Sequence, residues 1–594
     1  MPPALDAKTL AEAFQRTAAE NAEKVALRTK DDAFSATWGE YAERVRRVAA
    51  GLAALGVGRG DTVGLMLTNR PEFHFADAGA MHLGATAFSV YNTSTAEQIA
   101  YLLEDAANRV LFTERALLET VTEARAGENA LEHVVVVDGE AGERTLTLAD
   151  LEARGEEGFD FEAAWRAVEP EDLLTLIYTS GTTGPPKGVQ LSHAAMMAAI
   201  RSFDQVVGLK PDGSVISWLP MAHIAERNVS HYLPMASGAT VTCCPDPRQV
   251  VAYLTEVRPT WFFAVPRIWE KLMAAMEVGF AAEEDEAKQA AIEWALGVGR
   301  RRVAAEQAGE ELSDELREEH AKADELVLSK LRERIGLDRA EAVNVGAAPS
   351  PPEVIEFFHA IGVSLAELWG MSETCAAGTC NPSERSKIGT VGPPAPGVEL
   401  KLAEDGEILV RGPMTMVGYR NDPEKTRETI DGEGWLHTGD VGELDGDGYL
   451  RIVDRKKELI ISSAGKNMSP ANIEAKIKAA CPLIGQVVAV GDDRPYIVAL
   501  VVLDPDAAPA FAAEQGIGDG SLEALAAEPA VLGEVAAGVE RGNAGLARVE
   551  QVKKFKLLPA EWQPGGVELT PTMKLKRRPI EHRYQAEIEE LYAE

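Results

Sequence analysis

The sequence predicts an α/β fold: a large N-terminal domain of several subdomains, with layered α/β sheets and a small β subdomain, then a smaller α+β domain. Up to residue 138, short apolar runs alternate with helical patterns, as in sheets covered by helices. The 594 residues exceed what one compact core holds. Residues 388–452 carry short alternating runs typical of β structure.

In the first part of the chain, segments with helical spacing of apolar residues alternate with short apolar runs. Apolar residues at helical spacing predict helices, and short apolar runs predict strands. In chain order we expect a helix over 10–20, a strand over 24–29, a helix over 37–56, a strand over 61–69, a helix over 75–85, and strands over 86–91, 109–114 and 133–138. The acidic stretch from about 140 to 168 is weakly patterned and predicts a surface excursion.

The second part repeats the pattern and then changes. We expect a strand over 173–178, a helix over 192–203, a strand over 239–244, a helix over 248–257 and, over 278–334, a solvated helical insertion without Pro. The charged run Asp454–Lys457 separates the β subdomain from a smaller α/β unit, so we place the domain boundary there, giving 1–453 and 454–594. The Ala-rich stretch 506–547 is expected to be helical.

Composition limits the classes of partner. Asp and Glu outnumber Lys and Arg by 94 to 59, and the formal charge of −35 argues against general nucleic-acid binding. The five Cys form no CxxC pair, which suits a reducing cytoplasm. The N-terminus lacks a secretory signal, and no apolar run is long enough to span a bilayer. Peripheral contact with the inner membrane face and the oligomeric state stay open.

One stretch, Tyr178–Val189, reads YTSGTTGPPKGV and follows an apolar strand. Its Gly residues let the backbone fold closely around a ligand, and its amides and hydroxyls can cradle phosphate. Lys187 adds a mobile positive charge. The spacing differs from the common phosphate loop, which needs a hydroxyl residue directly after the Lys, where this chain has Gly188. The alternative interpretation is a mobile surface loop of small residues.

The full string resembles the signature loop of the acyl-adenylate-forming (AMP-binding) superfamily. That family includes acyl-CoA synthetases, firefly luciferase and peptide-synthetase adenylation domains. The resemblance implies that the loop binds the phosphates of ATP, through Thr179, Ser180, Gly181, Thr182, Thr183, Gly184 and Lys187.

A second motif, LWGMSET at 368–374, resembles the family's YGxTE segment. The resemblance implies that Glu373 binds Mg²⁺, a hard cation that prefers oxygen ligands. It also implies that Gly370 and Ser372 bind the nucleotide, with Ser372 beside the phosphate. Trp369 replaces the usual Tyr and keeps an aromatic face for adenine, although the hydroxyl is lost. Taken alone, a Glu in a loop is usually a solvated charge. Upstream, VGAAPS at 345–350 resembles the adenine loop, where Gly346 matches and Ala347 replaces a second Gly.

A third motif, HTGD at 437–440, matches the family's ribose-binding turn and implies that Asp440 binds the ribose hydroxyls. The alternative is turn capping, which Asp often performs. Arg455 resembles the family's second ribose or phosphate contact, and Asp454 occupies the hinge position. His223, in LPMAHIAE, resembles a pocket-lining His and is assigned to substrate positioning. A lone His among apolar residues is more often a core residue.

The last elements lie in the smaller domain. Lys574, in LTPTMKLKRR, resembles the family's catalytic Lys, which reaches across from that domain. The alternative is a basic surface patch. The segment SSAGKNMSP at 462–470, which includes Gly465, resembles the loop that lines the thiol tunnel. The resemblance extends over almost the whole chain, with the motifs in family order.

The resemblance implies ATP-dependent activation of a carboxylic acid to an acyl-adenylate, with Mg²⁺ as cofactor, followed by transfer to a thiol. Because the chain ends soon after Lys574, we expect a free thiol, coenzyme A, rather than a carrier domain. The forms LPMAHIAER and PRIWEKL resemble long-chain fatty acyl-CoA synthetases, in particular the bacterial and "bubblegum" branch. The alternatives are a ligase for aryl or short- to medium-chain acids, and a non-catalytic nucleotide-binding regulator.

Overall fold

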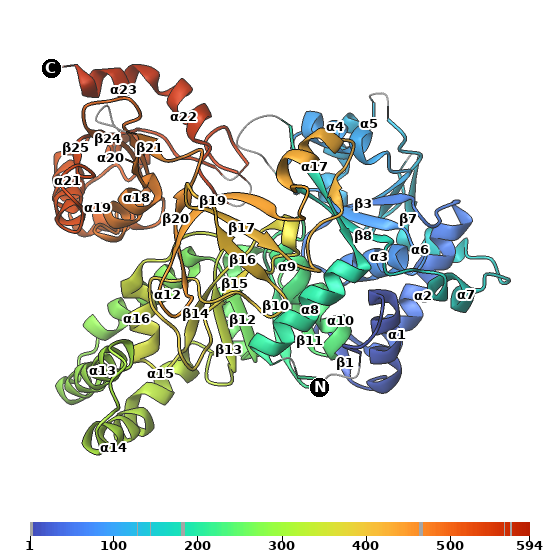
Figure 1. Ribbon diagram of the computed structural model, residues 1–594, viewed down its shortest axis with the longest axis horizontal. Coiled ribbons are helices and arrows are strands. Elements are labelled where there is room, and N and C mark those ends of the chain that lie inside the picture. The colour runs from blue at the N-terminus through green and yellow to red at the C-terminus, as the bar shows by residue number, and fades with distance from the viewer. Residues whose placement is uncertain are drawn as a thin grey trace.

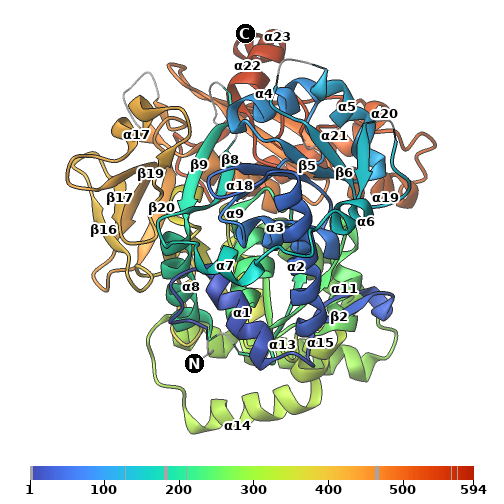
Figure 2. The ribbon, with the colours of Figure 1, turned by 90° about the vertical axis from the view of Figure 1, so that its right-hand side faces the viewer.

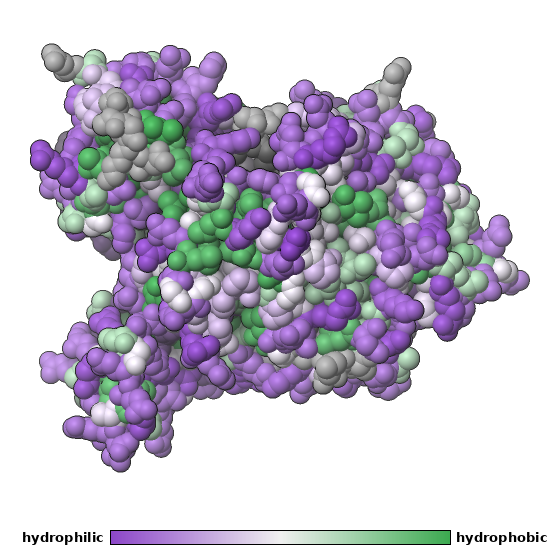
Figure 3. All heavy atoms as spheres, viewed as in Figure 1, coloured by the Kyte–Doolittle hydropathy of each residue, from purple (hydrophilic) through white to green (hydrophobic). Residues whose placement is uncertain are grey.

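A computed structural model of the chain describes residues 4–126, 129–142, 144–179, 185–208, 210–461, 467–563, 565–570 and 573–593. A large N-terminal lobe carries a smaller C-terminal lobe, drawn in orange and red at the upper left of Figure 1. Polar and charged side chains cover most of the face shown in Figure 3. Among the described helices, none combines the length and apolar character that crossing a bilayer requires.

The largest sheet of the described chain has 8 strands. In spatial order they are β18 (Gly418–Tyr419), β9 (Lys187–Ser192), β8 (Leu173–Thr179), β4 (Thr86–Ser89), β3 (Thr62–Met66), β5 (Val110–Thr113), β6 (His133–Val136) and β7 (Thr145–Thr147). Strands β3, β4 and β5 are buried throughout, because helices cover both faces of a parallel sheet. Within this sheet only the pairs β8–β9 and β9–β18 are antiparallel.

Two further sheets complete the layered part of the large lobe. One has the order β10 (Ser214–Ser217), β11 (Thr240–Cys243), β1 (Val25–Thr29) and β2 (Ser35–Thr37). The other has the order β12 (Trp261–Ala264), β13 (Ala342–Val345), β14 (Leu365–Trp369) and β15 (Thr379–Cys380). In both, the strands that run parallel end at the same edge, so the segments that follow β13 and β14 lie close together.

Helices surround these sheets and form an arm at one end. Those of the large lobe are α1 (Leu10–Glu20), α2 (Trp38–Ala54), α3 (Pro71–Met81), α4 (Ala96–Ala106), α5 (Leu118–Arg125), α6 (Leu148–Ala153), α7 (Phe161–Arg166), α8 (His193–Val207), α9 (Ile224–Arg227), α10 (Leu233–Ser237), α11 (Val250–Val257), α12 (Pro266–Ala281), α13 (Glu286–Gln307), α14 (Asp314–Ala323), α15 (Ser329–Arg334), α16 (Pro352–Ala360) and α17 (Pro423–Thr429). The predicted helical insertion forms α13 to α15, which extend from the body in Figures 1 and 2.

The β subdomain is an antiparallel sheet of β16 (Glu399–Leu402), β17 (Glu407–Arg411), β19 (Leu436–Leu444) and β20 (Leu450–Arg455). The small lobe follows it. It contains β21 (Ile460–Ile461), β22 (Asn467–Met468), β23 (Ile484–Val490), β24 (Ile497–Leu503), β25 (Val552–Leu557), α18 (Pro470–Ala479), α19 (Ala507–Glu514), α20 (Leu522–Leu525), α21 (Pro529–Ala544), α22 (Arg577–Arg583) and α23 (Gln585–Tyr592). Its two apolar clusters contain only residues beyond 459. The domain division at Asp454 stays a prediction.

Ion pairs connect the lobes in this arrangement. Arg267 of α12 pairs with Asp504, and the Lys271 ammonium lies 2.8 Å from the Asp506 carboxylate. Asp454, at the predicted hinge, accepts hydrogen bonds from the small lobe, at 2.5 Å from the Ser469 hydroxyl and 3.1 Å from the backbone amide of Ala471. The end of the β subdomain is therefore bonded to the start of α18.

Two segments differ from the expectation. Residues 140–168 are not a featureless excursion, since they contain β7, α6 and α7, which bury Leu151 and Trp165 against the main core. The segment after Pro186 forms strand β9 before the expected helix begins. Its mixture of Lys, Gly and Gln gave no strand pattern, and pairing with β8 and β18 stabilises it.

Candidate functional site

The predicted phosphate loop joins β8 to β9 at one side of the large sheet. Thr179 and Lys187 are register partners across these strands, while Ser180, Gly181, Thr182, Thr183 and Gly184 lie outside the described residues. The Lys187 ammonium lies 5.5 Å from the centre of the Tyr419 ring. Burial, together with the nearby Lys425 charge, lowers the pKa of Lys187.

Glu373 lies in a short helical turn, η6 (Ser372–Thr374), and is buried. The Tyr419 hydroxyl donates to its carboxylate at 2.8 Å, and the Met416 amide donates to its backbone carbonyl at 2.7 Å. Because Tyr419 pairs with Val189 in the large sheet, these bonds bring Glu373 next to the strand that begins at Lys187. The two motifs, far apart in sequence, thus meet.

The backbone approaches itself closely around these motifs. At Gly370 a Cβ would lie 2.1 Å from the Ala376 carbonyl oxygen, and at Gly346 it would lie 2.8 Å from the Leu368 carbonyl oxygen. Both positions therefore exclude a side chain. Ala347, where the resemblance expects a second Gly, has a φ of 70°, in the region that Gly occupies most readily.

Trp369, Asp440 and Arg455 form one connected group. The Trp369 indole N–H donates to the Asp440 carboxylate at 2.9 Å, so the substitution of Trp for Tyr retains a hydrogen bond. The Arg455 guanidinium lies 3.3 Å from the other carboxylate oxygen, because Asp440 and Arg455 are partners across β19 and β20. Burial raises the pKa of Asp440, and the Arg455 charge opposes that shift.

Lys574 of the small lobe faces this group. Its side chain is exposed to solvent, yet protein atoms crowd around the ammonium. This burial and the Arg455 charge lower the pKa of Lys574 to about 8, against the opposing charges of Asp440 and Glu373. The lysine from the far end of the chain therefore lies close enough to sense both predicted nucleotide-site carboxylates.

His223, in the large lobe, lies close enough to Lys574 to feel its charge. It caps α9, and its Nδ1 accepts a hydrogen bond from the Ala225 amide at 3.2 Å. Burial and then the Lys574 charge lower the pKa of His223 to about 3. The imidazole is therefore neutral at pH 7, and since Nδ1 is the acceptor, its proton is carried by Nε2. Gly465, in the predicted thiol loop, lies outside the described residues.

Two residues of the site were missed in the sequence. Tyr419 lies 46 residues from Glu373, and no local pattern links them. Glu367 is two residues before Trp369 in β14 and so shares its face of the strand. Its Oε2 is buried without a hydrogen-bond partner among the described residues, and burial raises its pKa to about 8. The sequence signal that could have identified Glu367 is an acidic residue in an otherwise apolar strand.

Family models match most of the chain. The model of the AMP-binding enzyme matches residues 14–420, and that of the AMP-binding enzyme C-terminal domain matches residues 457–594. The predicted superfamily resemblance is confirmed.

Named relatives and solved structures agree with this family. The chain is 55% identical over 450 residues, 76% of its length and 79% of the relative's, to fadD11 of Mycobacterium tuberculosis, a provisionally named fatty-acid–CoA ligase. It is 35% identical over 580 residues, 94% of its length and 92% of the relative's, to the long-chain-fatty-acid–CoA ligase FadD15 of Mycobacterium bovis.

Among solved structures, the anthranilate CoA ligase AuaEII in complex with anthranoyl-AMP superimposes with a TM-score of 0.73 at 20% identity, over 98% of both chains. At that identity the likeness shows the fold, and it confirms the predicted α/β class with a large N-terminal and a smaller C-terminal domain. The chain belongs to the AMP-binding enzyme family and is related to its fatty-acid–CoA ligases.

Proposed function

We propose that the protein activates a long-chain fatty acid with ATP and transfers the acyl group to coenzyme A. In the first step a carboxylate oxygen attacks the α-phosphorus, forming the acyl-adenylate and expelling pyrophosphate. In the second step the coenzyme A thiol attacks the acyl carbonyl, forming the thioester and releasing AMP. The observation that carries the proposal is the position of Lys574, which lies in the small lobe yet close enough for electrostatic interaction with Asp440, Glu373 and His223.

The first step brings anions together, so Coulomb repulsion is its main obstacle. Fixed positive charge at the point where charge develops is the strongest kind of stabilisation in such a site. Lys187 and Lys574 supply it from two lobes, and both side chains have lowered pKa values because of burial. Bound phosphate would raise those pKa values again, since an anion favours the charged form of Lys.

The nucleoside is assigned to the group around Trp369. The edge of the indole donates its N–H to Asp440. The flat face of the ring can therefore serve for stacking with adenine. Each Asp440 oxygen has one close partner, from Trp369 or from Arg455, and a carboxylate has about four lone-pair sites. Asp440 can therefore still accept the two ribose hydroxyls. Glu367, with its unpartnered oxygen, is suited to bond the exocyclic group of the base.

The residues fit a Mg²⁺ ion held mainly by substrate. Within the described ranges, no group of three or more His, Cys, Asp and Glu side chains is arranged to hold a metal. Mg²⁺ is usually bound by one or two carboxylates together with phosphates and water, and Glu373 beside Lys187 offers one carboxylate oriented by Tyr419. When bound there, Mg²⁺ would neutralise part of the phosphate charge.

His223 is assigned to positioning rather than proton transfer. The attacking fatty acid is already a carboxylate, and the imidazole does not titrate near pH 7. With Nδ1 bonded to the Ala225 amide, the Nε2 proton can donate to an anionic oxygen of the acid or the adenylate.

The second step requires the small lobe to move. In the proposed mechanism Lys574 lies beside the nucleotide during adenylation, so a rotation at Asp454 would withdraw it and bring the segment that contains Gly465 to the adenylate for attack by the thiol. The choice of a long-chain acid is supported by the relatives, which include FadD15 and the long-chain-fatty-acid–CoA ligase ACSBG2 of Gallus gallus, 31% identical over 99% of this chain and 81% of the relative's.

A panel of acids tests the proposal. Purified protein with ATP and Mg²⁺ is expected to release pyrophosphate with palmitate, and to form AMP and palmitoyl-CoA when coenzyme A is added. Benzoate and acetate serve as controls. Release with benzoate but not palmitate would support an aryl-acid ligase, and no acid-dependent release would support a nucleotide-binding regulator.

The pH dependence of adenylation is expected to follow Lys574. Its charged form is the useful one, and its pKa of about 8 means that the charge is present below pH 8 and lost above it. We expect kcat/KM for ATP to fall about tenfold per pH unit well above pH 8, as for one titrating group. In Lys574→Arg this fall should move to higher pH, because Arg stays charged. An identical alkaline limb in both proteins would remove Lys574 from this role.

A further inference from the structure

The turn that presents Glu373 is strained. Cys375 and Ala376, directly after η6, have φ values of 52° and 63°, both left-handed and neither a Gly. Such conformations cost free energy and persist only where the surroundings hold them. The turn closes through the Ala376 amide, which donates to the Met371 carbonyl at 2.9 Å. The direction of the Glu373 side chain thus depends on a backbone shape that needs external support.

Asn228 supplies such support. Its Nδ2 donates to the Cys375 carbonyl at 2.6 Å, across 147 residues of sequence. Asn228 is buried, and its Oδ1 has no hydrogen-bond partner among the described residues. This bond therefore orients the Asn228 amide. Its acceptor belongs to Cys375, one of the two residues in the left-handed conformation.

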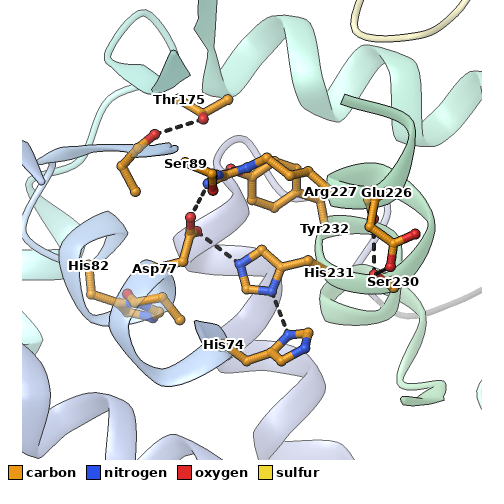
Figure 4. A network of polar contacts seen from close by, with 12 residues as sticks. His74, Asp77, His82, Ser89, Thr175, Glu226, Arg227, Ser230, His231 and Tyr232 are labelled. Carbon is orange, nitrogen blue, oxygen red and sulfur yellow. Dashed lines mark hydrogen bonds and ion pairs between the residues drawn. The ribbon is translucent and has the colours of Figure 1, made fainter. Parts of the chain in front are cut away.

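The segment that carries Asn228 is itself firmly held. Asn228 begins η3 (Asn228–Tyr232), a π-helical turn directly after α9, and such turns are common at functional sites. Figure 4 shows how α3 holds this turn from one side. Asp77 bonds Arg227 and, at 2.9 Å, His231, and the His231 Nδ1 lies 2.8 Å from the His74 Nδ1. The Ser230 hydroxyl, in turn, donates to the Glu226 carboxylate at 2.6 Å.

After the cap residue His223, α9 therefore runs without a break into η3, which ends at Tyr232. The cap residue His223 lies close enough to Lys574 to feel its charge, and Asn228, five residues later, holds the turn of Glu373. The polar network around Asp77 is fully buried, so the segment has no freedom to shift without breaking charged hydrogen bonds. The Asn228 amide can thus transmit that rigidity to the Glu373 turn.

We propose that Asn228 is a positioning residue for the reaction: its bond to the Cys375 carbonyl holds the turn that aims Glu373 at the metal–phosphate group. The inference rests on the proposed function, in which Glu373 binds Mg²⁺. Residues that orient a metal ligand typically affect metal affinity by about 10–100-fold.

The test compares binding of ATP with and without Mg²⁺, by calorimetry, in wild type, Asn228→Ala and Glu373→Gln. We expect Asn228→Ala to weaken binding in the presence of Mg²⁺ by about 10-fold, to raise the Mg²⁺ concentration that half-saturates adenylation, and to leave Mg²⁺-free ATP binding unchanged. The KM for palmitate should stay within twofold of wild type, because the proposed function assigns the acid to His223 and not to Asn228 or Glu373.

Asn108→Ala is the matched control. Asn108 is also buried, also donates its Nδ2 to a backbone carbonyl, that of Val110 at 3.0 Å, and also has an unpartnered Oδ1 among the described residues. It should lower the unfolding midpoint comparably without altering the Mg²⁺ dependence. If Asn228→Ala does not fold, Asn228→Leu removes the donor while keeping similar volume.

The outcomes separate the two hypotheses. If Glu373→Gln weakens Mg²⁺-dependent binding and Asn228→Ala behaves like Asn108→Ala, the positioning role is wrong and the function stands. If neither variant changes the Mg²⁺ dependence, the role of Glu373 is wrong and the inference about Asn228 falls with it.

Discussion

Lys574→Ala is expected to lower the rate of acyl-adenylate formation by about 10²–10³-fold, the usual effect of removing one stabilising group at a developing charge. The variant loses the cation that the small lobe brings to Asp440 and Glu373. Thioester formation from supplied acyl-adenylate and coenzyme A should change by less than about threefold, because in the proposed mechanism Lys574 is withdrawn from the nucleotide before the thiol attacks. Single-turnover assays of each half-reaction measure the two effects separately.

Lys576→Ala provides the control. Lys576 lies two residues further on, and its ammonium donates to the Gly566 carbonyl at 2.8 Å, within the small lobe. The substitution removes one positive charge from the same segment and leaves Lys574, Asp440 and Glu373 in place, so both half-reactions should proceed at near wild-type rates. Equal losses of both half-reactions in Lys574→Ala would contradict the assigned role.

Asp77→Ala is expected to have the largest effect on stability, lowering the free energy of unfolding by about 3–5 kcal/mol. Asp77 and Arg227 have no exposed side-chain surface. Burial alone would raise the pKa of Asp77, but the Arg227 charge holds it below its ordinary value, so the two form an ion pair. Removing the carboxylate leaves the buried guanidinium with only the neutral Ser89 and Tyr232 hydroxyls as acceptors, and leaves the His231 Nε2 without its Asp77 acceptor. Denaturant unfolding, followed by tryptophan fluorescence, measures the loss.

Two comparisons identify the cause. Asp6→Ala breaks the exposed pair with Arg16, where the Asp side chain is 77% exposed, and should cost less than about 1 kcal/mol. The double variant Asp77→Leu with Arg227→Met should recover much of the loss, because the penalty comes from the unpaired charge rather than from the lost attraction. Similar losses in Asp77→Ala and Asp6→Ala would show that the network contributes little.

The fold could be predicted wherever the signal was local. Buried strands such as β3 and β5, and amphipathic helices such as α2, follow from apolar periodicity, and their bounds lie within a few residues of those predicted. Strand β9 could not be predicted, because its residues have no strand pattern and pairing with the neighbouring strands decides its conformation. The helices between 140 and 168 are short, and acidic residues obscure their apolar faces.

By itself, the sequence determined the family and the residues from which a site could be assembled. Each motif consists of residues adjacent in sequence, so its chemistry can be inferred without the fold. Examples are the Gly-rich loop before Lys187 and the turn of Asp440. Only the tertiary structure decided which groups meet: Trp369 with Asp440, Tyr419 with Glu373, and the Asn228 amide with the Cys375 carbonyl. It also brought the Lys574 charge near His223. The physical reason is that these contacts join residues distant in the chain, and they form only because the packing of apolar cores and the docking of two lobes fix where each backbone segment lies.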